Sequence, residues 1–224
     1  WYFKRRAPPI KPTGIKTHYP LPKAKEKGCV LRSYDDLNGQ VKPLRVAVQC
    51  DEQQKVTVIS LQNASVQDVA VVQTPAVVHL KDKLQRQGVA QVTVLGENNV
   101  PLAERLVYRN RLRELDVVVS TPKKQFSPRE SVSLHIQTKD HNGKPVAANL
   151  ALSVVDDTLL KYADDKKGHI LSQLYLESFL MDTVEEPIWY FDKDEPLAAL
   201  GLDLLMGTKG WRRFEWKDGG FRGI

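Results

Sequence analysis

Lys139–Asp157 reads K-D-H-N-G-K-P-V-A-A-N-L-A-L-S-V-V-D-D, and this stretch decides the predicted fold. It contains Asn142-Gly143, the dipeptide that most readily takes positive φ at both central positions of a two-residue hairpin turn. From Val146 to Val155, apolar residues alternate with small or polar ones, which is the period of a half-buried strand. The alternation ends at Asp156-Asp157, where helix-like spacing begins. The stretch therefore predicts a hairpin strand that closes the β-rich part of the chain.

Residues 28–110, which precede this stretch, carry short apolar runs separated by turn signals. Asn38-Gly39, Gln87-Gly88 and Asn98-Asn99 supply the turns. Seven short strands in about eighty residues are typical of a β-sandwich of the immunoglobulin-like type. The predicted strands are Cys29–Tyr34, Leu44–Cys50, Val56–Gln62, Val66–Val72, Ala76–Lys81, Val89–Leu95 and Leu102–Tyr108.

A second β unit is predicted over residues 111–156, after a short polar hinge at Asn110–Glu114. Its strands are Leu115–Ser120, Ser131–Thr138 and the run from Val146, and the loop between the first two contains prolines that bar a continuous ladder. Three strands are too few for an independent sandwich, so we expect a partial sheet.

The region 157–209 is predicted to be mainly helical, as an excursion from this second sheet. Its candidate helices are Thr158–Ala163, Ile170–Leu180 and a helix behind Pro196, in which Leu197, Leu200 and Leu204 share one face. Residues 210–224 follow with alternating aromatics from Trp211 to Trp216, which predicts a strand returning to the second sheet and then a loose C-terminal end.

The charge of the chain is unevenly placed. The formal net charge is +6, but residues 1–27 carry eight Lys or Arg against one Glu, so the rest of the chain is close to neutral. Prolines interrupt residues 1–27, which predicts a linker or docking strand. A nucleic-acid-binding domain should carry its basic face on the folded part, so no nucleic-acid partner is predicted. No apolar run approaches the ~18 residues of a membrane span, so no membrane insertion is predicted.

The chain begins at Trp1 without an initiator Met, and we expect it to be a piece of a longer protein. Its cysteines, Cys29 and Cys50, each fall in a predicted strand at a spacing unlike that of zinc ligands. They could form a disulfide between neighbouring strands, which would indicate an oxidising compartment. Alternatively, they are two small buried apolar side chains.

Several runs, taken in order, resemble a known family. Gly88–Leu95 followed by Pro101–Tyr108 resembles the end of one macroglobulin-like domain of the bacterial alpha-2-macroglobulin family. Four later segments resemble the start of the next such domain, namely Leu115–Val117, Phe126–Val132, Asp140–Pro145 and Leu152–Asp156. Three further segments resemble a subgroup of Bacteroidetes cell-envelope proteins, namely Glu185-Glu186-Pro187, Tyr190-Phe191-Asp192 and Leu202–Trp216. In that subgroup, such domains are often linked to carboxypeptidase-regulatory-like or TonB-receptor-plug-like modules.

The resemblance covers residues 27–217 and implies two macroglobulin-like β units in the periplasm or at the outer membrane. The thioester motif Gly-Cys-Gly-Glu-Gln of the trapping members is absent. The resemblance therefore implies a non-catalytic structural or interaction module. Its expected partners are other domains of the parent chain or envelope proteins, with self-association through the second sheet as a further expectation.

The residues give no sign of an enzyme or of a cofactor. The histidines, at 18, 79, 135, 141 and 169, lack the spacing of a zinc helix, and no nucleophile elbow or phosphate loop is present. The carboxylates of Asp192, Asp194 and Glu195 could bind calcium. They are also typical of solvated acids at a helix start.

Aromatic clusters are the best candidates for recognition, because Trp, Tyr and Arg anchor interfaces. The same clusters could instead form a second small core between helices and sheet. Exposed aromatics would suit a module that binds a glycan or a peptide, and capture of a protease is a further alternative. The predicted interaction surface comprises Trp189, Tyr190, Trp211, Arg212, Arg213 and Trp216.

Overall fold

The computed structural model describes the two β units and most of the helical region. Predictions for residues 1–27 fall almost wholly outside the described part, as do the turn at Asn38-Gly39, most of the helix at Thr158–Ala163 and the returning strand at Trp211–Trp216. The described residues are 14, 16, 28–34, 43–83, 85–156, 158, 169–180 and 183–209.

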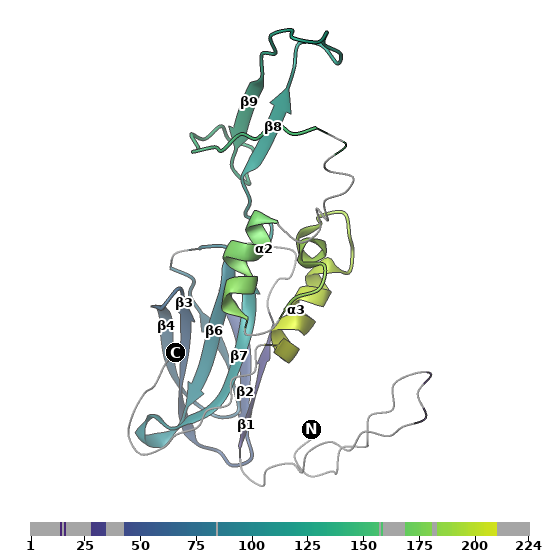
Figure 1. Cartoon of the computed structure of the whole chain (residues 1–224). Helices are drawn as coiled ribbons and strands as arrows, with labels where there is room; N and C mark the ends of the chain where they lie inside the picture. Colours follow the sequence, from purple (N-terminus) through teal and green to yellow (C-terminus); the bar gives the residue numbers. More distant parts are fainter. Residues whose placement is uncertain are drawn as a thin grey trace.

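Two antiparallel sheets form the body of the molecule, and the mainly β fold is as predicted (Figure 1). One sheet has the order β1-β2-β5 and the other β4-β3-β6-β7. Each strand ends within one residue of its predicted limits. The strands are β1 (Cys29–Ser33), β2 (Leu44–Cys50), β3 (Lys55–Gln62), β4 (Ser65–Gln73), β5 (Ala76–Leu80), β6 (Gly88–Leu95) and β7 (Pro101–Arg109).

The strand order bears on the immunoglobulin-like prediction. In constant-type immunoglobulin domains the fourth strand lies in the sheet of the first, second and fifth strands. Here β4 instead pairs with β3, with Val56 opposite Val72 and Ile59 opposite Val69. The sandwich is therefore present, and its assignment to the immunoglobulin-like type stays a prediction.

The core of the body lies between the two sheets, where alternation places every second side chain. Val58 of β3, Val92 and Val94 of β6, and Val46 of β2 are each 0% exposed. Burying a Val or Leu side chain contributes roughly 1.5–3 kcal/mol relative to leaving it in water. The period-two pattern of the sequence therefore becomes the main source of stability of the sandwich.

Two hairpin turns of the body use positive φ. Asn98 and Asn99 have φ of 56° and 58° between β6 and β7, at a turn that the sequence predicts. Asn63 and Ala64, between β3 and β4, have φ of 50° and 58°. Asn tolerates this region because its short polar side chain can bond locally, whereas Ala has no such compensation.

Helical segments form a third layer on the outer face of β6 and β7. Val89, Leu106 and Tyr108 of these strands pack against Leu176 and Phe191 in a second core. The helical excursion is thus present, and its described segments pack on the body, whereas the prediction attached it to the second sheet. Its segments are α2 (Ile170–Tyr175), η3 (Glu177–Phe179), η4 (Pro187–Phe191) and α3 (Ala198–Lys209).

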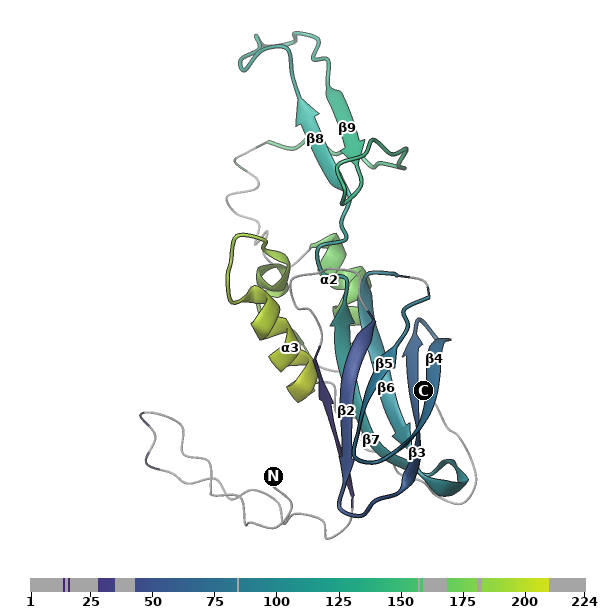
Figure 2. The same cartoon turned by 180° about the vertical axis from the view of Figure 1, so that it is seen from behind.

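The longest of these helices, α3, runs beside β7 and the edge strand β1 (Figure 2). Asp203 Oδ1 accepts hydrogen bonds from Arg105 Nη2 at 2.7 Å and from Ser33 Oγ at 3.3 Å. The face predicted from Leu197, Leu200 and Leu204 is 48–59% exposed, and the helix buries Leu202 and Met206 instead. Since α3 is apolar on nearly every side, its period could not indicate which face would be buried.

No helix among the described residues is long and apolar enough to cross a membrane.

The second β unit projects beyond α2 and consists of β8 (Asp116–Ser120) and β9 (His135–Lys139) (Figures 1 and 2). The predicted strand over Val146–Val155 is wrong. Val146 N donates to Thr138 O at 3.1 Å, and Pro145 forms an isolated bridge to Lys139. Beyond that point, residues 147–156 are exposed and form no strand. A period-two pattern supports a strand only where a neighbouring strand is available to pair with it.

The predicted two-residue turn at Asn142-Gly143 is also wrong. Gly143 alone has positive φ, at 78°, and its N–H donates to Asp140 O at 2.8 Å. Asp140 N donates to Lys144 O at 2.8 Å, so the loop has three residues. Asp140 Oδ1 accepts the N–H groups of Asn142 and Lys144, both at 2.9 Å, which favours this longer loop over the two-residue form.

Candidate interaction site at the junction of the two β units

The segment that joins β7 to β8, predicted as a short polar hinge, buries two of its polar residues. Asn110 and Arg111 are 4% and 6% exposed. Buried polar groups are stable only when they are hydrogen-bonded. The partners of these two side chains therefore determine how firmly the second β unit is attached to the body.

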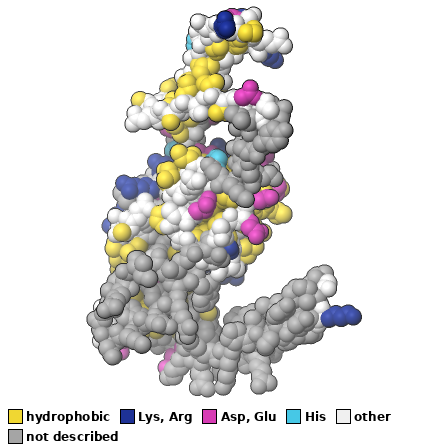
Figure 3. Space-filling model, in the orientation of Figure 1, with side chains coloured by type: hydrophobic (Ala, Val, Ile, Leu, Met, Phe, Trp, Pro, Cys, Tyr) yellow, Lys and Arg dark blue, Asp and Glu magenta, His cyan; other side chains and the backbone are white. Residues whose placement is uncertain are grey.

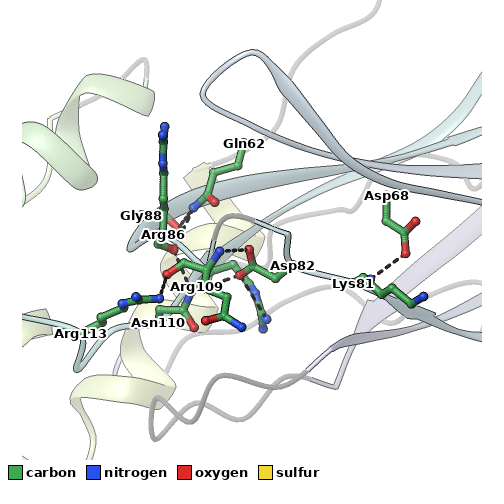
Figure 4. Close-up of polar contacts among 10 residues, drawn as sticks. Gln62, Asp68, Lys81, Asp82, Arg86, Gly88, Arg109, Asn110 and Arg113 are labelled. Carbon is green, nitrogen blue, oxygen red and sulfur yellow. Dashed lines mark hydrogen bonds and ion pairs between the residues drawn. The ribbon is translucent and has the colours of Figure 1, made fainter. Parts of the chain in front are cut away.

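Asn110 is held by the loop that joins β5 to β6 (Figure 4). Its Nδ2 donates to Asp82 Oδ2 at 3.1 Å and to Arg86 O at 2.8 Å. Asp82 Oδ1 in turn accepts the N–H of Gln85 at 2.7 Å. Arg109 Nη2 lies 3.6 Å from Asp82 Oδ2, and these two side chains are only 3% and 8% exposed. A buried ion pair, whose carboxylate also accepts hydrogen bonds from Asn110 and Gln85, thus fixes the end of β7.

Arg111 ties the same segment to the helical layer. Its Nη1 donates to the backbone oxygens of Tyr190 and Asp192, at 3.1 and 3.0 Å. Burial lowers the pKa of Arg111 from its ordinary value, and the carboxylates of Glu114 and Asp192 oppose that shift. The guanidinium therefore links the hinge to η4 in a partly desolvated setting.

Glu114 completes the junction. Its Oε2 pairs with Lys193 Nζ at 3.0 Å, and the Glu114 side chain is 14% exposed. Its Oε1 is buried and has no hydrogen-bond partner. Arg113 Nη1 also donates to Gln85 O, which adds a further contact between the hinge and the β5–β6 loop. The side chains of Asn110, Arg111, Arg113 and Glu114 each reach a different neighbour.

A pocket of about 390 Å³ lies beside this junction. Glu114, Glu186 and Asp192 contribute carboxylates to its lining, and Trp189 and Phe191 contribute aromatic rings. Leu171 and Ile188 complete its apolar part.

His169, immediately before α2, is a further member of the lining. Its ring stacks on that of Phe191, with centroids 6.3 Å apart and an interplanar angle of 28°. Its Nδ1 is buried without a hydrogen-bond partner. In the sequence this histidine is one of five that lack the spacing of a zinc helix, and the structure places it at the junction.

The predicted interaction residues are only partly described. Trp189 and Tyr190 are half-buried, with ring centroids 5.2 Å apart in an edge-to-face arrangement. The Trp189 ring covers Gly201 of α3 so closely that an added Cβ there would lie 2.5 Å from Trp189 Cζ3. Trp189 thus packs on the helical layer and also lines the pocket. The other predicted members, Trp211, Arg212, Arg213 and Trp216, lie outside the described residues.

Cys29 and Cys50 form a disulfide, with the Sγ atoms 1.99 Å apart. They are directly opposite each other in the antiparallel pairing of β1 with β2. The bond therefore fastens the edge strand β1 to its only hydrogen-bonded neighbour among the described strands.

The carboxylates considered for calcium act as local caps. Asp192 Oδ1 accepts the N–H of Asp194 at 2.9 Å, and Glu195 Oε1 accepts the N–H of Leu197 at 3.1 Å. Across the described ranges, no group of three His, Cys, Asp or Glu side chains is placed to hold a metal ion. These contacts favour the interpretation of solvated acids at a helix start.

The buried junction residues were missed by sequence reasoning. Asn110–Glu114 reads N-R-L-R-E, a composition typical of an exposed connection. Burial of Asn110 and Arg111 depends on Asp82 and on backbone oxygens near residue 190, which are distant in sequence. The one local signal is Asn110 itself, which has φ of 54°, a region that Asn tolerates better than most residues.

No protein-family model and no curated protein matches this chain.

Proposed function

We propose that this chain is a non-catalytic structural and interaction module of a larger cell-envelope protein, similar to macroglobulin-like domains that lack a thioester. In this proposal the sandwich is a rigid support that holds the second β unit for pairing with another domain or chain. The observation that carries it is the contrast between a buried, hydrogen-bonded hinge and an exposed apolar sheet. A hinge fixed by Asp82, Asn110 and Arg111 would present that sheet in one orientation.

The second β unit has the properties of an interaction surface. All five residues of β8 are exposed, and Val117, Val118 and Val119 are 43%, 43% and 53% exposed. Figure 3 shows hydrophobic side chains along this projecting unit. A two-stranded sheet alone is marginally stable in water, and a contiguous exposed apolar patch marks an interaction site. Pairing with further strands would satisfy both.

An oxidising location is supported by the disulfide between Cys29 and Cys50, since such bonds persist in secreted and periplasmic proteins and are rare in the cytosol. The proposed location is therefore the periplasm or the outer-membrane surface.

Sedimentation measurements over a wide range of protein concentration test the proposal. We expect concentration-dependent association that is abolished by Val119→Lys on β8. Val69→Lys is the matched control, because Val69 lies on β4 of the body and is 50% exposed, close to the 53% of Val119. A monomer at every concentration, with the β8 and β9 amides protected from hydrogen exchange, would contradict the proposal, because a sheet that is stable alone needs no partner.

A second candidate function, a module that binds peptides, is favoured by one observation. The pocket at the junction combines aromatic and acidic side chains with two buried acceptors that have no hydrogen-bond partner.

A further inference from the structure

Two residues that line the junction pocket each carry a buried hydrogen-bond acceptor without a partner. These acceptors are Glu114 Oε1 and His169 Nδ1. An ionised carboxylate only accepts hydrogen bonds, and the Nδ1 of a neutral imidazole can accept when Nε2 carries the proton. Buried polar side-chain atoms are hydrogen-bonded in the large majority of cases. Two such acceptors on residues that line one pocket therefore favour a ligand that donates hydrogen bonds.

The charge of the pocket indicates that the donor is a cation. Its lining includes the carboxylates of Glu114, Glu186 and Asp192, and none of the described residues that line it is a Lys or Arg. Of the described basic groups at the junction, Lys193 binds the other oxygen of Glu114, and Arg111 donates to backbone oxygens near residue 190. A carboxylate or phosphate ligand would face these three acids, whereas a cation would be attracted by them.

The apolar part of the lining indicates what carries the cation. Trp189 and Phe191 offer ring surfaces, and the pocket of about 390 Å³ is at the small end of ligand cavities. A guanidinium stacks on aromatic faces while its methylene stem covers apolar surface. Its planar fork also donates several N–H groups in fixed directions, which suits two separate acceptors better than a compact ammonium does.

We propose that this pocket binds the arginine side chain of a peptide segment, with the guanidinium donating to Glu114 Oε1 and to His169 Nδ1. This inference rests on the proposed interaction function and names the chemistry of one partner. Trp189 provides a stacking surface for the guanidinium. The pocket touches both the hinge and η4, so the bound side chain lies where the second β unit joins the body.

Calorimetric titration of the full chain with a short arginine peptide, acetylated and amidated at its ends, tests this inference. The control ligand is the same peptide with citrulline, which has the shape of arginine without its charge. We expect the arginine peptide to bind at least tenfold more tightly than the citrulline peptide. Free L-arginine separates a peptide from an amino-acid ligand. Its α-carboxylate would face the acidic lining, so we expect it to bind more weakly than the capped peptide.

Two pocket variants and one matched control localise the binding. Glu114→Gln keeps the shape of the side chain and should weaken peptide binding at least tenfold. His169→Phe keeps a ring to stack on Phe191 but removes Nδ1, and it should weaken binding a few-fold. Glu97→Gln removes the same charge from the exposed β6–β7 turn, outside the pocket lining, and should leave binding unchanged. His169→Phe keeps the test decisive if Glu114→Gln destabilises the junction.

Three results would overturn the inference: no binding of the arginine peptide, equal binding of the citrulline peptide, or tighter binding of free arginine. Equal weakening by Glu97→Gln would also overturn it, because the attraction would then be a general effect of charge. The proposed function is tested separately, through Val119→Lys on β8. If Val119→Lys loses association but retains peptide binding, the result would support both the proposed function and the arginine site. If one of the two measurements contradicts its proposal, the other proposal can still be judged.

Discussion

The two β units of this chain differ in how they use the same alternating pattern. In the body, Val46, Val58 and Val92 are completely buried between two sheets. In the second unit, Val119 and Leu152 are 53% and 61% exposed. Both units have apolar runs with period two, so this pattern does not explain the difference. The number of strands available to pair and to cover each face does.

This contrast indicates two different sources of order. The body has seven paired strands, a disulfide and a helical layer. The second unit has one ladder of five residue pairs, from Asp116↔Lys139 to Ser120↔His135. Its attachment relies on polar contacts of the hinge. We therefore expect the body to unfold cooperatively and the second unit to contribute little to that transition.

The largest expected effect comes from deleting a leucine side chain in each unit. Leu44→Ala removes a side chain that is 2% exposed and should lower the free energy of unfolding by about 3–4 kcal/mol, through lost burial and the cavity left behind. Leu152→Ala, at 61% exposure, should change it by less than about 0.5 kcal/mol. Urea denaturation of both variants measures the difference. A large cost for Leu152→Ala would mean that another surface covers the second unit.

Removal of the disulfide should have the next largest effect. The bond joins residues 21 apart, so its loss should cost about 3 kcal/mol through the entropy regained by the unfolded chain. The double variant Cys29→Ala and Cys50→Ala should show this in thermal unfolding. Adding reductant should lower the stability of the wild type to the level of the variant and leave the variant unchanged. The hydrogen-exchange rates of β8 and β9 should be the same in the double variant and in the reduced protein as in the oxidised wild type. A change in these rates would contradict the proposed independence of the two units.

The pH dependence of stability should differ between one aspartate of the body and one of the second unit. Asp68 Oδ2 on β4 accepts the N–H of Lys81 at 2.7 Å, at the end of β5, so it connects the two sheets. This hydrogen bond is the main reason that the pKa of Asp68 lies below its ordinary value of 3.8. Since the pKa is lowered on folding, the stabilisation is present above pH 3.8 and is lost as the pH falls through the folded value.

The variant Asp68→Asn should therefore cost about 1 kcal/mol near neutral pH, and the cost should shrink toward zero in acid. Asp140→Asn is the matched control in the second unit. The pKa of Asp140 is also lowered, chiefly by the N–H of Lys144, but its bonds stay within one exposed loop. Denaturation curves of this control should match the wild type at every pH. A pH-dependent loss for Asp140→Asn would show that its loop is coupled to the body.

How far the sequence predicts this molecule depends on whether the partners of a residue are local. The seven body strands are confirmed to within one residue, because alternation and turn residues are local signals. The strand predicted over Val146–Val155 is wrong, because a strand needs a neighbouring strand to pair with, and the pattern of one segment does not show whether a neighbour exists. The burial of Arg111 in the polar hinge could not be predicted, since its acceptors lie near residue 190, far away in the sequence. In α3, apolar residues lie on almost every side. Tertiary packing therefore decides that Met206 is buried and Leu204 is exposed.

The smallest expected effect compares one turn from each unit. Ala64 has φ of 58°, and a left-handed conformation costs a residue with a Cβ about 1–2 kcal/mol. The variant Ala64→Gly removes this conformational cost. Part of the gain in stability is offset because glycine is more flexible in the unfolded chain, so the variant should stabilise the body by about 0.5 kcal/mol.

Gly143 has φ of 78° in the second unit, with no atom within 4 Å of an added Cβ. Gly143→Ala therefore meets no steric clash and should destabilise its own loop by about 1 kcal/mol through the backbone alone. Its effect should appear as faster hydrogen exchange at Lys144 and Val146, with the melting temperature of the body unchanged. A shift in that temperature equal to the one from Ala64→Gly, in either direction, would show that the loop and the sandwich unfold together. The second unit would then be part of the body's cooperative unit, and its exposed sheet would need a stabilising contact within this chain.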